Sequence, residues 1–412
     1  MGLLGKYRGF RALWTGQLLS QMGNALFLIM GLWEIQLRQP VLLAGAGLAM
    51  TIPAGLAVFG GVYVDRMDPR RLMLWTDVLR GVAVALGLVA LMVPGSLMAV
   101  IIALLGINSL GNALFGPSES VLIPWLVSPE DLAGANGLYS LTAQLASTVG
   151  SALGGAAIVA LGVTVVFGMD LASFWLSALA ILLMMRTVAA RPRAQATQDA
   201  PRAGFWHELT SGFQSLKTLP GLIQLMPIAV AANFAGVAAF TMFPYWVRAQ
   251  LHAGALSYGL IDASFAAGLV LGSLSVGAFR RWPIRSVSAV AFGLQGLLLG
   301  VLALTTAPLV AGVWLFVAGA ANGVGNALLF TLFQRLVPDA LRGRVFGMLF
   351  SLITMANPLG ALAAGVFLHV LPLWWAWAFM ALTGLGITVG ILVWMPKNAD
   401  DAPDTGAAAA GA

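Results

Sequence analysis

Cysteine is absent from this chain of 412 residues, and charged residues are scarce. Without cysteine the chain has no disulfide, no thiolate metal site and no cysteine nucleophile. Only 9% of the residues are charged, against about 25% in a typical soluble domain, whereas 60% are hydrophobic. These proportions indicate an integral membrane protein.

The sequence signatures of common enzymes are also missing. The chain contains no H-E-x-x-H zinc motif, no G-x-S-x-G nucleophile motif and no G-x-x-x-x-G-K phosphate-binding loop. Its three lysines, Lys6, Lys217 and Lys397, lie outside the apolar runs. We therefore predict that the protein is not an enzyme, is not driven by ATP, and uses no cofactor and no metal.

Apolar runs dominate what is present. A run of about 20 apolar residues crosses a ~30 Å hydrocarbon core, and an isolated span in lipid must be helical to satisfy its backbone hydrogen bonds. The sequence predicts an all-α membrane protein with twelve such helices. They are expected at 11–37, 42–64, 72–93, 97–117, 136–161, 163–185, 222–247, 256–279, 286–306, 310–334, 345–370 and 373–395.

The basic residues predict the orientation of these helices. If the N-terminus is cytoplasmic, every Lys and Arg except Arg38, Arg80 and Arg248 falls on the cytoplasmic side or in the cytoplasmic tail, as the positive-inside rule requires. The sequence pI of 10.2 then reflects attraction to anionic lipid headgroups, and no nucleic-acid partner is expected. We predict a multi-pass protein of the bacterial inner membrane with both termini in the cytoplasm.

The longest polar interruption divides the chain into two halves. We predict an N-terminal six-helix bundle at 1–185, a cytoplasmic connector at 186–221, and a C-terminal six-helix bundle at 222–395. Within the connector, FWHELTSGFQSLKTL has apolar residues at helical spacing and is expected to lie on the membrane surface. The tail at 396–412 is expected to be disordered.

The two halves resemble each other in sequence. INSLGNALF at 107–115 aligns with ANGVGNALLF at 321–330, which pairs Asn108 with Asn322 and Asn112 with Asn326. This agreement indicates an internal duplication. The word GNALF also occurs at 23–27. Segments 1 and 4 would run antiparallel, so we attribute the occurrence of GNALF in both to the amino-acid composition of the chain.

Several motifs carry a family resemblance. GGVYVDRMDPRRLML, between segments 2 and 3, resembles the G-x-x-x-D-R-x-x-R-R signature of the major facilitator superfamily. GSALGG in segment 5 resembles the antiporter-associated motif of that superfamily. FGPSESVLIPWLVSPEDLAGAN, PDALRGRVFG and NPLGALAAG resemble the branch that holds enterobactin exporters and macrolide efflux proteins. Two residues depart from that branch: Asn24 replaces a common aspartate, and Glu119 an arginine.

The resemblance implies a fold and a mechanism. Two pseudo-symmetric bundles of six helices would rock about a central cavity and so expose it to each side of the membrane in turn. The signature loop would act as a latch between conformations. Segment 3 adds Asp77 and Arg80, whose i, i+3 spacing allows them to pair. We predict the latch to comprise Gly61, Asp65, Arg66, Arg70, Arg71, Asp77 and Arg80, and close helix packing at Gly150, Gly154 and Gly155.

Segments 1, 4, 7 and 10 line the cavity in this superfamily, and each carries asparagine here. Such polar faces either line a water-filled path or hydrogen-bond one helix to another, an effect of about 0.6–2 kcal/mol per contact. We predict that they line the substrate cavity. The candidate residues are Gln17, Gln21, Asn24, Phe27, Asn108, Asn112, Asn233, Asn322 and Asn326.

Ionisable residues within membrane segments are functional candidates. Glu34, near the outer end of segment 1, and Asp262, in segment 8, are the predicted proton-coupling residues. The alternative is a structural role at the membrane interface, with each carboxylate paired to Arg38 or Arg248.

Together these features predict a secondary transporter that exports a bulky amphipathic compound by proton-coupled antiport. Its expected partners are a small-molecule substrate, protons and the lipid bilayer, and it is expected to be a monomer. An uptake symporter, a lysolipid translocator, a membrane enzyme and a non-transporting sensor are the alternatives.

Overall fold

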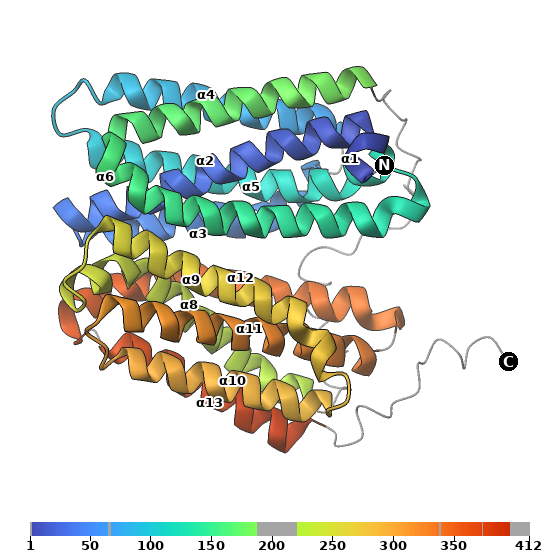
Figure 1. Cartoon of the computed structure of the whole chain (residues 1–412), viewed down its shortest axis with the longest axis vertical. Helices are drawn as coiled ribbons and strands as arrows, with labels where there is room; N and C mark the ends of the chain where they lie inside the picture. Colours follow the sequence, from blue (N-terminus) through green and yellow to red (C-terminus); the bar gives the residue numbers. More distant parts are fainter. Residues whose placement is uncertain (1, 65–66, 188–220, 338, 373, 396–412) are drawn as a thin grey trace, which may run out of the picture. The chain divides into compact units, whose positions relative to one another are not determined.

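The computed structural model describes the chain except residues 1, 65–66, 188–220, 338, 373 and 396–412 (Figure 1). The predicted surface helix and tail lie outside the described residues. The described part is helical, and ten of its helices are long and apolar enough to cross a membrane. One of the ten, α6, covers two predicted segments. α3 is not among the ten, but it covers the segment predicted at 42–64. The structure therefore confirms the twelve predicted helices.

The helices follow the predicted order and start within a few residues of the predicted positions. From the N-terminus they are α1 Leu3–Lys6, α2 Arg8–Arg38, α3 Leu42–Val64, α4 Pro69–Ala90, α5 Leu97–Leu126, η1 Pro129–Asp131 and α6 Leu132–Thr187. After the connector come α8 Leu222–Ala249, α9 Ala255–Ser275, η2 Val276–Phe279, α10 Ile284–Leu302, α11 Pro308–Leu336, α12 Asp339–Val370 and α13 Trp374–Trp394.

By their contacts the described residues form two compact units. The first unit consists of those within Met1–Asp199 and Pro244–Ala263, and the second of those within Ala200–Phe243 and Ser264–Ala412. This division assigns 244–263 to the first unit, whereas the sequence predicts one boundary in the connector at 186–221. The division into six and six helices therefore stays a prediction at the level of domain boundaries. In the first unit, α2 packs mainly on α6, and α4 packs on α5 and α6 (Figure 1).

α6 is two membrane helices joined at one glycine. Gly162 has φ 78° and ψ 171°, a conformation outside the helical region that residues with a side chain rarely adopt. It stands between the predicted segments 136–161 and 163–185. The chain therefore changes direction at Gly162 with no loop between the two helices.

The start of α4 is determined by its first residues. Asp68 caps the helix by accepting a hydrogen bond from the backbone N–H of Arg70 at 3.0 Å, and Pro69 occupies the first turn, where its missing N–H costs nothing. The Arg70 guanidinium also hydrogen-bonds the Asp68 carboxylate at 2.7 Å, which lowers the pKa of Asp68 below its usual value. Asp68 and Arg70 thus stabilise the first turn of α4.

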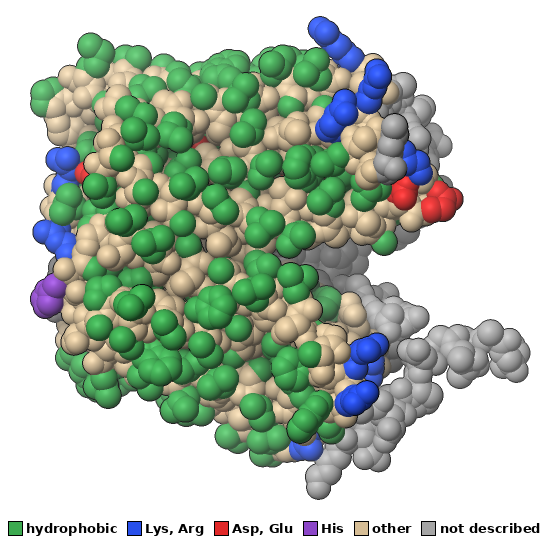
Figure 2. All heavy atoms as spheres, in the orientation of Figure 1, with side chains coloured by type: hydrophobic (Ala, Val, Ile, Leu, Met, Phe, Trp, Pro, Cys, Tyr) green, Lys and Arg blue, Asp and Glu red, His purple; other side chains and the backbone are tan. Residues whose placement is uncertain are grey.

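Large apolar side chains cover the outer faces of the helices. Leu86 of α4, Leu274 of α9, Leu297 of α10 and Leu382 of α13 are between 60% and 67% exposed, which in a soluble protein would form an aggregating surface. Figure 2 shows apolar side chains spread across the drawn face, with most of the Lys and Arg side chains near its edges. These are lipid-facing surfaces of a membrane protein.

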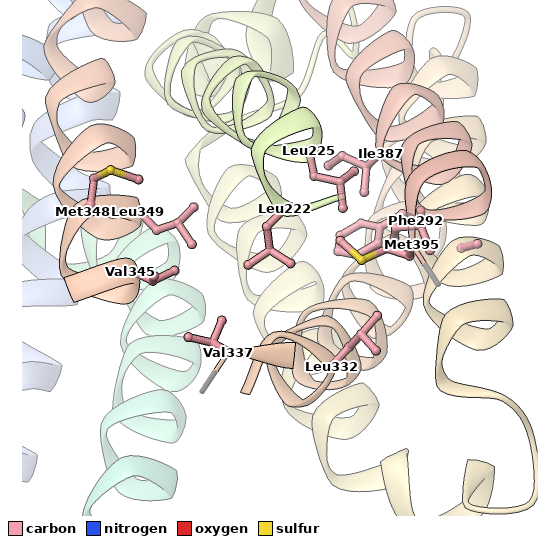
Figure 3. Close-up of a cluster of buried hydrophobic side chains, with 12 residues drawn as sticks. Leu222, Leu225, Phe292, Leu332, Val337, Val345, Met348, Leu349, Ile387 and Met395 are labelled. Atoms are coloured by element: carbon pink, nitrogen blue, oxygen red, sulfur yellow. The ribbon is translucent and has the colours of Figure 1, made fainter. Parts of the chain in front are cut away.

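Each unit has its own buried apolar cluster. In the first, Phe10 and Leu13 of α2 pack with Met73 of α4 and Leu122 of α5. In the second, Leu222 and Leu225 at the start of α8 pack among side chains of α10 and α13 (Figure 3). The other side chains labelled there are Phe292, Leu332, Val337, Val345, Met348, Leu349, Ile387 and Met395.

A polar contact joins the N-terminal end of α2 to the segment after α5. The Tyr7 hydroxyl lies 2.8 Å from the Asp131 carboxylate and accepts a hydrogen bond from the Ser128 N–H at 3.2 Å. Lys6 Nζ lies 2.6 Å from the same carboxylate. Its hydrogen bond to Asp131, followed by that with Tyr7, raises the pKa of Lys6 above its usual value.

Tyr7→Phe is expected to lower the stability of the first unit by about 1 kcal/mol, because it removes the hydroxyl that Ser128 and Asp131 share. Thermal unfolding of the purified protein in detergent measures this. Lys6→Met is the comparison, and its effect should be smaller because the ammonium is solvent-exposed. A larger loss for Lys6→Met than for Tyr7→Phe would contradict the assignment.

Candidate functional site

An ion pair lies at the middle of α4. Arg80 Nη1 is 3.7 Å from Asp77 Oδ1, one helical turn away, as the sequence predicts. Asp77 is 0% exposed and Arg80 2%. From the capping residue Asp68, Asp77 lies about 13 Å along the helix. The charges are therefore well separated from the loop that precedes α4.

α5 supplies the hydrogen-bond acceptors for the arginine. Arg80 Nη2 donates to the backbone oxygen of Asn108 at 2.8 Å and to Oδ1 of Asn112 at 2.9 Å. Gly111 lies between them, and a Cβ there would overlap the Arg80 guanidinium. The missing side chain allows the guanidinium to lie directly on α5.

α6 brings a second carboxylate to the same place. Asp170 is 0% exposed and interacts electrostatically with Arg80. Asn108 faces Asp170, and Ser177 faces Asp77, but neither contact has hydrogen-bond geometry. We refer to Asp77, Arg80, Asn108, Asn112 and Asp170 as the Arg80 cluster.

Two aromatic rings enclose the arginine. The Arg80 guanidinium carbon lies 5.3 Å from the ring centroid of Phe115 in α5 and 5.5 Å from that of Phe174 in α6. Both distances are in the range of cation–π attraction. The rings help stabilise a cation in apolar surroundings, and they exclude water from it.

A third carboxylate lies nearer the end of α5. Glu119 is partly exposed, accepts a hydrogen bond from the Tyr139 hydroxyl of α6, and interacts electrostatically with Arg80. The Tyr139 hydroxyl in turn interacts with Gln21 of α2. Glu119 is thus a partly exposed acid whose charge acts on Arg80 from the end of α5.

The repeated word GNALF contributes to this site from two helices. Gly111 of the second copy lies against Arg80, and a Cβ there would collide with the guanidinium. Gly23 of the first copy lies against Asp170 and Ser173, and a Cβ there would collide with Ser173. Whatever the origin of the repeat, both glycines allow close approach of a polar group.

The corresponding place in the second unit is polar but uncharged. Asn322 donates to Oε1 of Gln295 in α10 at 3.0 Å, and Asn326 donates to Oδ1 of Asn322 at 2.9 Å. Asn322 and Asn326 are the counterparts of Asn108 and Asn112 in the internal repeat. Gln295 thus takes the place that Arg80 has in the first unit.

The other predicted cavity residues are distributed as follows. Gln17 is buried and donates to the Ser177 hydroxyl at 3.2 Å. Asn24 is partly exposed, and its Oδ1 lacks a hydrogen-bond partner. Phe27 is 0% exposed and meets Phe167 edge to face at 5.2 Å.

In the second unit, Asn233 of α8 donates hydrogen bonds to the side-chain oxygen of Asn357 in α12 and to the backbone oxygen of Ile353. Gln17, Asn233 and Asn322 thus bond helix to helix, which is the alternative considered for the polar faces. Asn112 and Asn326 are exposed. Lining of a substrate cavity stays a prediction for the whole set.

The two predicted proton-coupling residues lie in different environments. Glu34 is buried and accepts a hydrogen bond from Nε of Arg38 at 2.9 Å, and Arg38 itself is 57% exposed. Asp262 is partly exposed and interacts with the Ser151 hydroxyl. The pairing of Glu34 matches the structural alternative. The roles of both residues in coupling stay predictions.

The latch residues are only partly described. Asp65 and Arg66 lie outside the described residues, and Gly61 falls in α3. Arg70 is buried against Asp68, and Arg71 is exposed. Asp77 and Arg80 belong to the Arg80 cluster, and their predicted share in the latch is untested.

The glycines of the GSALGG motif lie at helix contacts. A Cβ at Gly150 or Gly154 would collide with Ala25 or Ile29 of α2, and one at Gly155 with the backbone oxygen of Ala255 in α9. Among the described residues, no group of three or more His, Asp or Glu side chains is placed to hold a metal ion.

Sequence reasoning did not find Asp170. The structure places it in α6, where it interacts electrostatically with Arg80 of α4. The available signal was the uneven distribution of charge: Asp77, Arg80, Glu119 and Asp170 all lie within helices of the first half, and only Asp262 lies deep within a helix predicted for the second.

Comparison with known proteins agrees with this architecture. The chain matches the Major Facilitator Superfamily over residues 13–352 and 225–411. It is 24% identical to macrolide efflux protein A of Streptococcus pyogenes, over 87% of this chain and 89% of that protein. It is 26% identical to an enterobactin exporter of Citrobacter koseri, over 95% and 92%.

A solved structure supports the same fold. A bacterial homologue of the iron transporter ferroportin, crystallised in an inward-facing state, superposes with a TM-score of 0.70 at 19% identity, over 95% of this chain and 99% of that one. At that identity the likeness concerns the fold alone. The chain belongs to the major facilitator superfamily and is a multi-pass membrane transporter.

Proposed function

We propose that the protein exports a bulky amphipathic compound by alternating access, in exchange for protons. Relatives named as exporters of macrolides and of enterobactin, each matched over about nine-tenths of its own length, support export and the substrate class. The compounds in these names are large and partly apolar, which suits the mixture of amide and aromatic side chains on α2, α5 and α8.

The observation that carries proton coupling is the buried Arg80 cluster. Ionisable groups cost several kcal/mol to bury in a membrane, so they are kept where they act on ions, protons or substrates. Here three such groups, Asp77, Arg80 and Asp170, are almost completely buried in the first unit, while the matching site of the second unit is neutral. This asymmetry supports a coupling site in one half of the transporter.

The proposal also includes the oligomeric state, the location and the partners of the protein. The protein acts as a monomer in the bacterial inner membrane, with both termini in the cytoplasm, and it engages lipid, protons and one small-molecule substrate. The positive-inside distribution of Lys and Arg supports this orientation.

Proteoliposomes with an imposed pH gradient test the proposal. A radiolabelled macrolide and enterobactin are the first probes. Antiport predicts uphill accumulation when the lumen is more acidic than the bath, and collapse of that accumulation when an ionophore dissipates the gradient. Accumulation driven by the opposite gradient would establish symport instead. Uphill accumulation that persists after collapse of the gradient would contradict proton coupling.

A further inference from the structure

We propose that Asp170 and Asp77 together hold one exchangeable proton, with Arg80 as the shared counter-charge. This proposal deepens the proposed function, because it names the site at which protons would couple to transport. It differs from the sequence prediction, which assigned coupling to Glu34 and Asp262.

The charges of the buried residues do not balance. Asp77 and Asp170 are each 0% exposed, and Arg80 is 2% exposed. When both carboxylates are ionised, two negative charges face one positive charge. An uncompensated charge in a membrane interior costs several kcal/mol. One proton on the carboxylate pair removes the excess charge.

Geometry indicates which carboxylate holds the proton in this conformation. Asp77 Oδ1 lies 3.7 Å from Arg80 Nη1, whereas no basic nitrogen lies within 4.0 Å of the Asp170 carboxylate among the described residues. Both oxygens of each carboxylate are buried and lack a hydrogen-bond partner, so the ion pair with Arg80 is what distinguishes Asp77 from Asp170. Asp170 is therefore the carboxylate to which we assign the proton.

The groups packed around the pair leave no other source of compensation. α5 contributes Asn108, Asn112 and Glu119, of which only Glu119 is charged, and its sign is negative. α6 contributes Tyr139, Ser173 and Ser177, which are neutral hydroxyls. α2 contributes Gly23, Gln17 and Gln21, and its charged residues lie toward its ends. Arg80 is the only cation facing the pair among the described residues.

The arginine has the means to change partners. Its Nη2 is held by Asn108 and Asn112, its Nη1 faces Asp77, and its Nε has no hydrogen-bond partner. Phe115 and Phe174 face the guanidinium without hydrogen bonds that would fix its direction. A shift of Arg80 toward Asp170 would favour release of the proton there and its uptake by Asp77.

The first test measures the proton on the protein and needs no substrate. Infrared spectroscopy of the purified wild type at neutral pH should show the carbonyl stretch of a buried protonated carboxyl group. Asp170→Asn should remove the contribution of one carboxyl group from that band, and Asp170→Glu should restore it. Glu34→Gln is the matched control and should leave it unchanged, because Glu34 is buried but paired with Arg38. A band identical in wild type and Asp170→Asn would overturn the assignment of the proton to Asp170.

A sodium ion is the other species able to neutralise the pair, and the same spectra decide between them. If a cation held both carboxylates ionised, the protonated band would be absent in wild type, and adding sodium chloride would shift the carboxylate bands. That result would overturn the proton assignment. Asparagine closely matches aspartate in volume and mimics its neutral form, so Asp170→Asn is expected to fold. Its thermal unfolding in detergent verifies this.

The second test links the site to transport with the same variants in proteoliposomes. Asp170→Asn should lose all accumulation driven by the pH gradient, yet retain exchange of labelled for unlabelled macrolide at equal pH. Retained gradient-driven accumulation in Asp170→Asn would overturn the role of this site. Absence of any gradient effect in wild type would instead refute the proposed antiport. In that case the infrared result still decides whether the pair holds a proton.

Discussion

Arg80→Met is expected to destabilise the first unit by about 3–5 kcal/mol, because it leaves the buried carboxylate of Asp77 without its counter-charge. Methionine keeps the apolar stem of the side chain but lacks the guanidinium that lies over Phe115 and Phe174, so part of the loss reflects packing. For a unit of this size the melting temperature in detergent should fall by on the order of 10 °C. Transport should be lost in the same variant.

A second substitution separates lost charge from lost packing. In Arg80→Met with Asp77→Asn and Asp170→Asn, no buried charge is left unpaired, and much of the stability should return while transport stays absent. Arg38→Met is the matched control, because it removes an exposed arginine that is also paired with a carboxylate. Equal losses of stability for Arg80→Met and Arg38→Met would contradict the account of the cluster.

Gly111→Ala is expected to lower both stability and transport, although alanine normally stabilises a helix by about 1 kcal/mol relative to glycine. The added methyl group would overlap the guanidinium of Arg80, so the arginine must leave the position between Asn108 and Asn112. Overpacking of this kind costs about 1–3 kcal/mol. Gradient-driven transport should fall sharply, since the ion pair with Asp77 is displaced as well.

The same helix provides the control for Gly111. A Cβ at Gly116 has no atom within 4 Å, so Gly116→Ala should be neutral or slightly stabilising and should transport like the wild type. Thermal unfolding and pH-driven accumulation are measured for both variants. If Gly111→Ala behaves like Gly116→Ala in both assays, the close approach of Arg80 to α5 is not required.

Much of the fold can be predicted from the sequence, because the length of an apolar run directly reflects the thickness of the membrane. The segments predicted at 42–64 and 222–247 begin at the same residues as α3 and α8. The largest departure is α5, which continues to Leu126 through Pro117 and Pro124, beyond the predicted end at 117. A helix leaving the hydrocarbon core no longer needs an apolar sequence, so hydropathy does not mark its end.

The site was less predictable, because a sequence does not show which side chains face each other across helices. The spacing of Asp77 and Arg80 within α4 indicated their pairing, but Asp170 joins them through contacts of α6 with α4. The glycines of GNALF gave a signal that was attributed to composition. Their function depends on contacts with α4 and α6, which the repeat alone does not reveal.

Proton movement driven by the substrate tests the central claim most directly. Proteoliposomes are loaded with macrolide and a pH-sensitive dye, and then diluted into substrate-free medium at the same pH. Efflux through a proton antiporter predicts acidification of the lumen in wild type and none in Asp170→Asn, with substrate leaving in both. Substrate efflux from wild-type vesicles at unchanged lumenal pH, or with alkalinisation, would contradict exchange of substrate for protons.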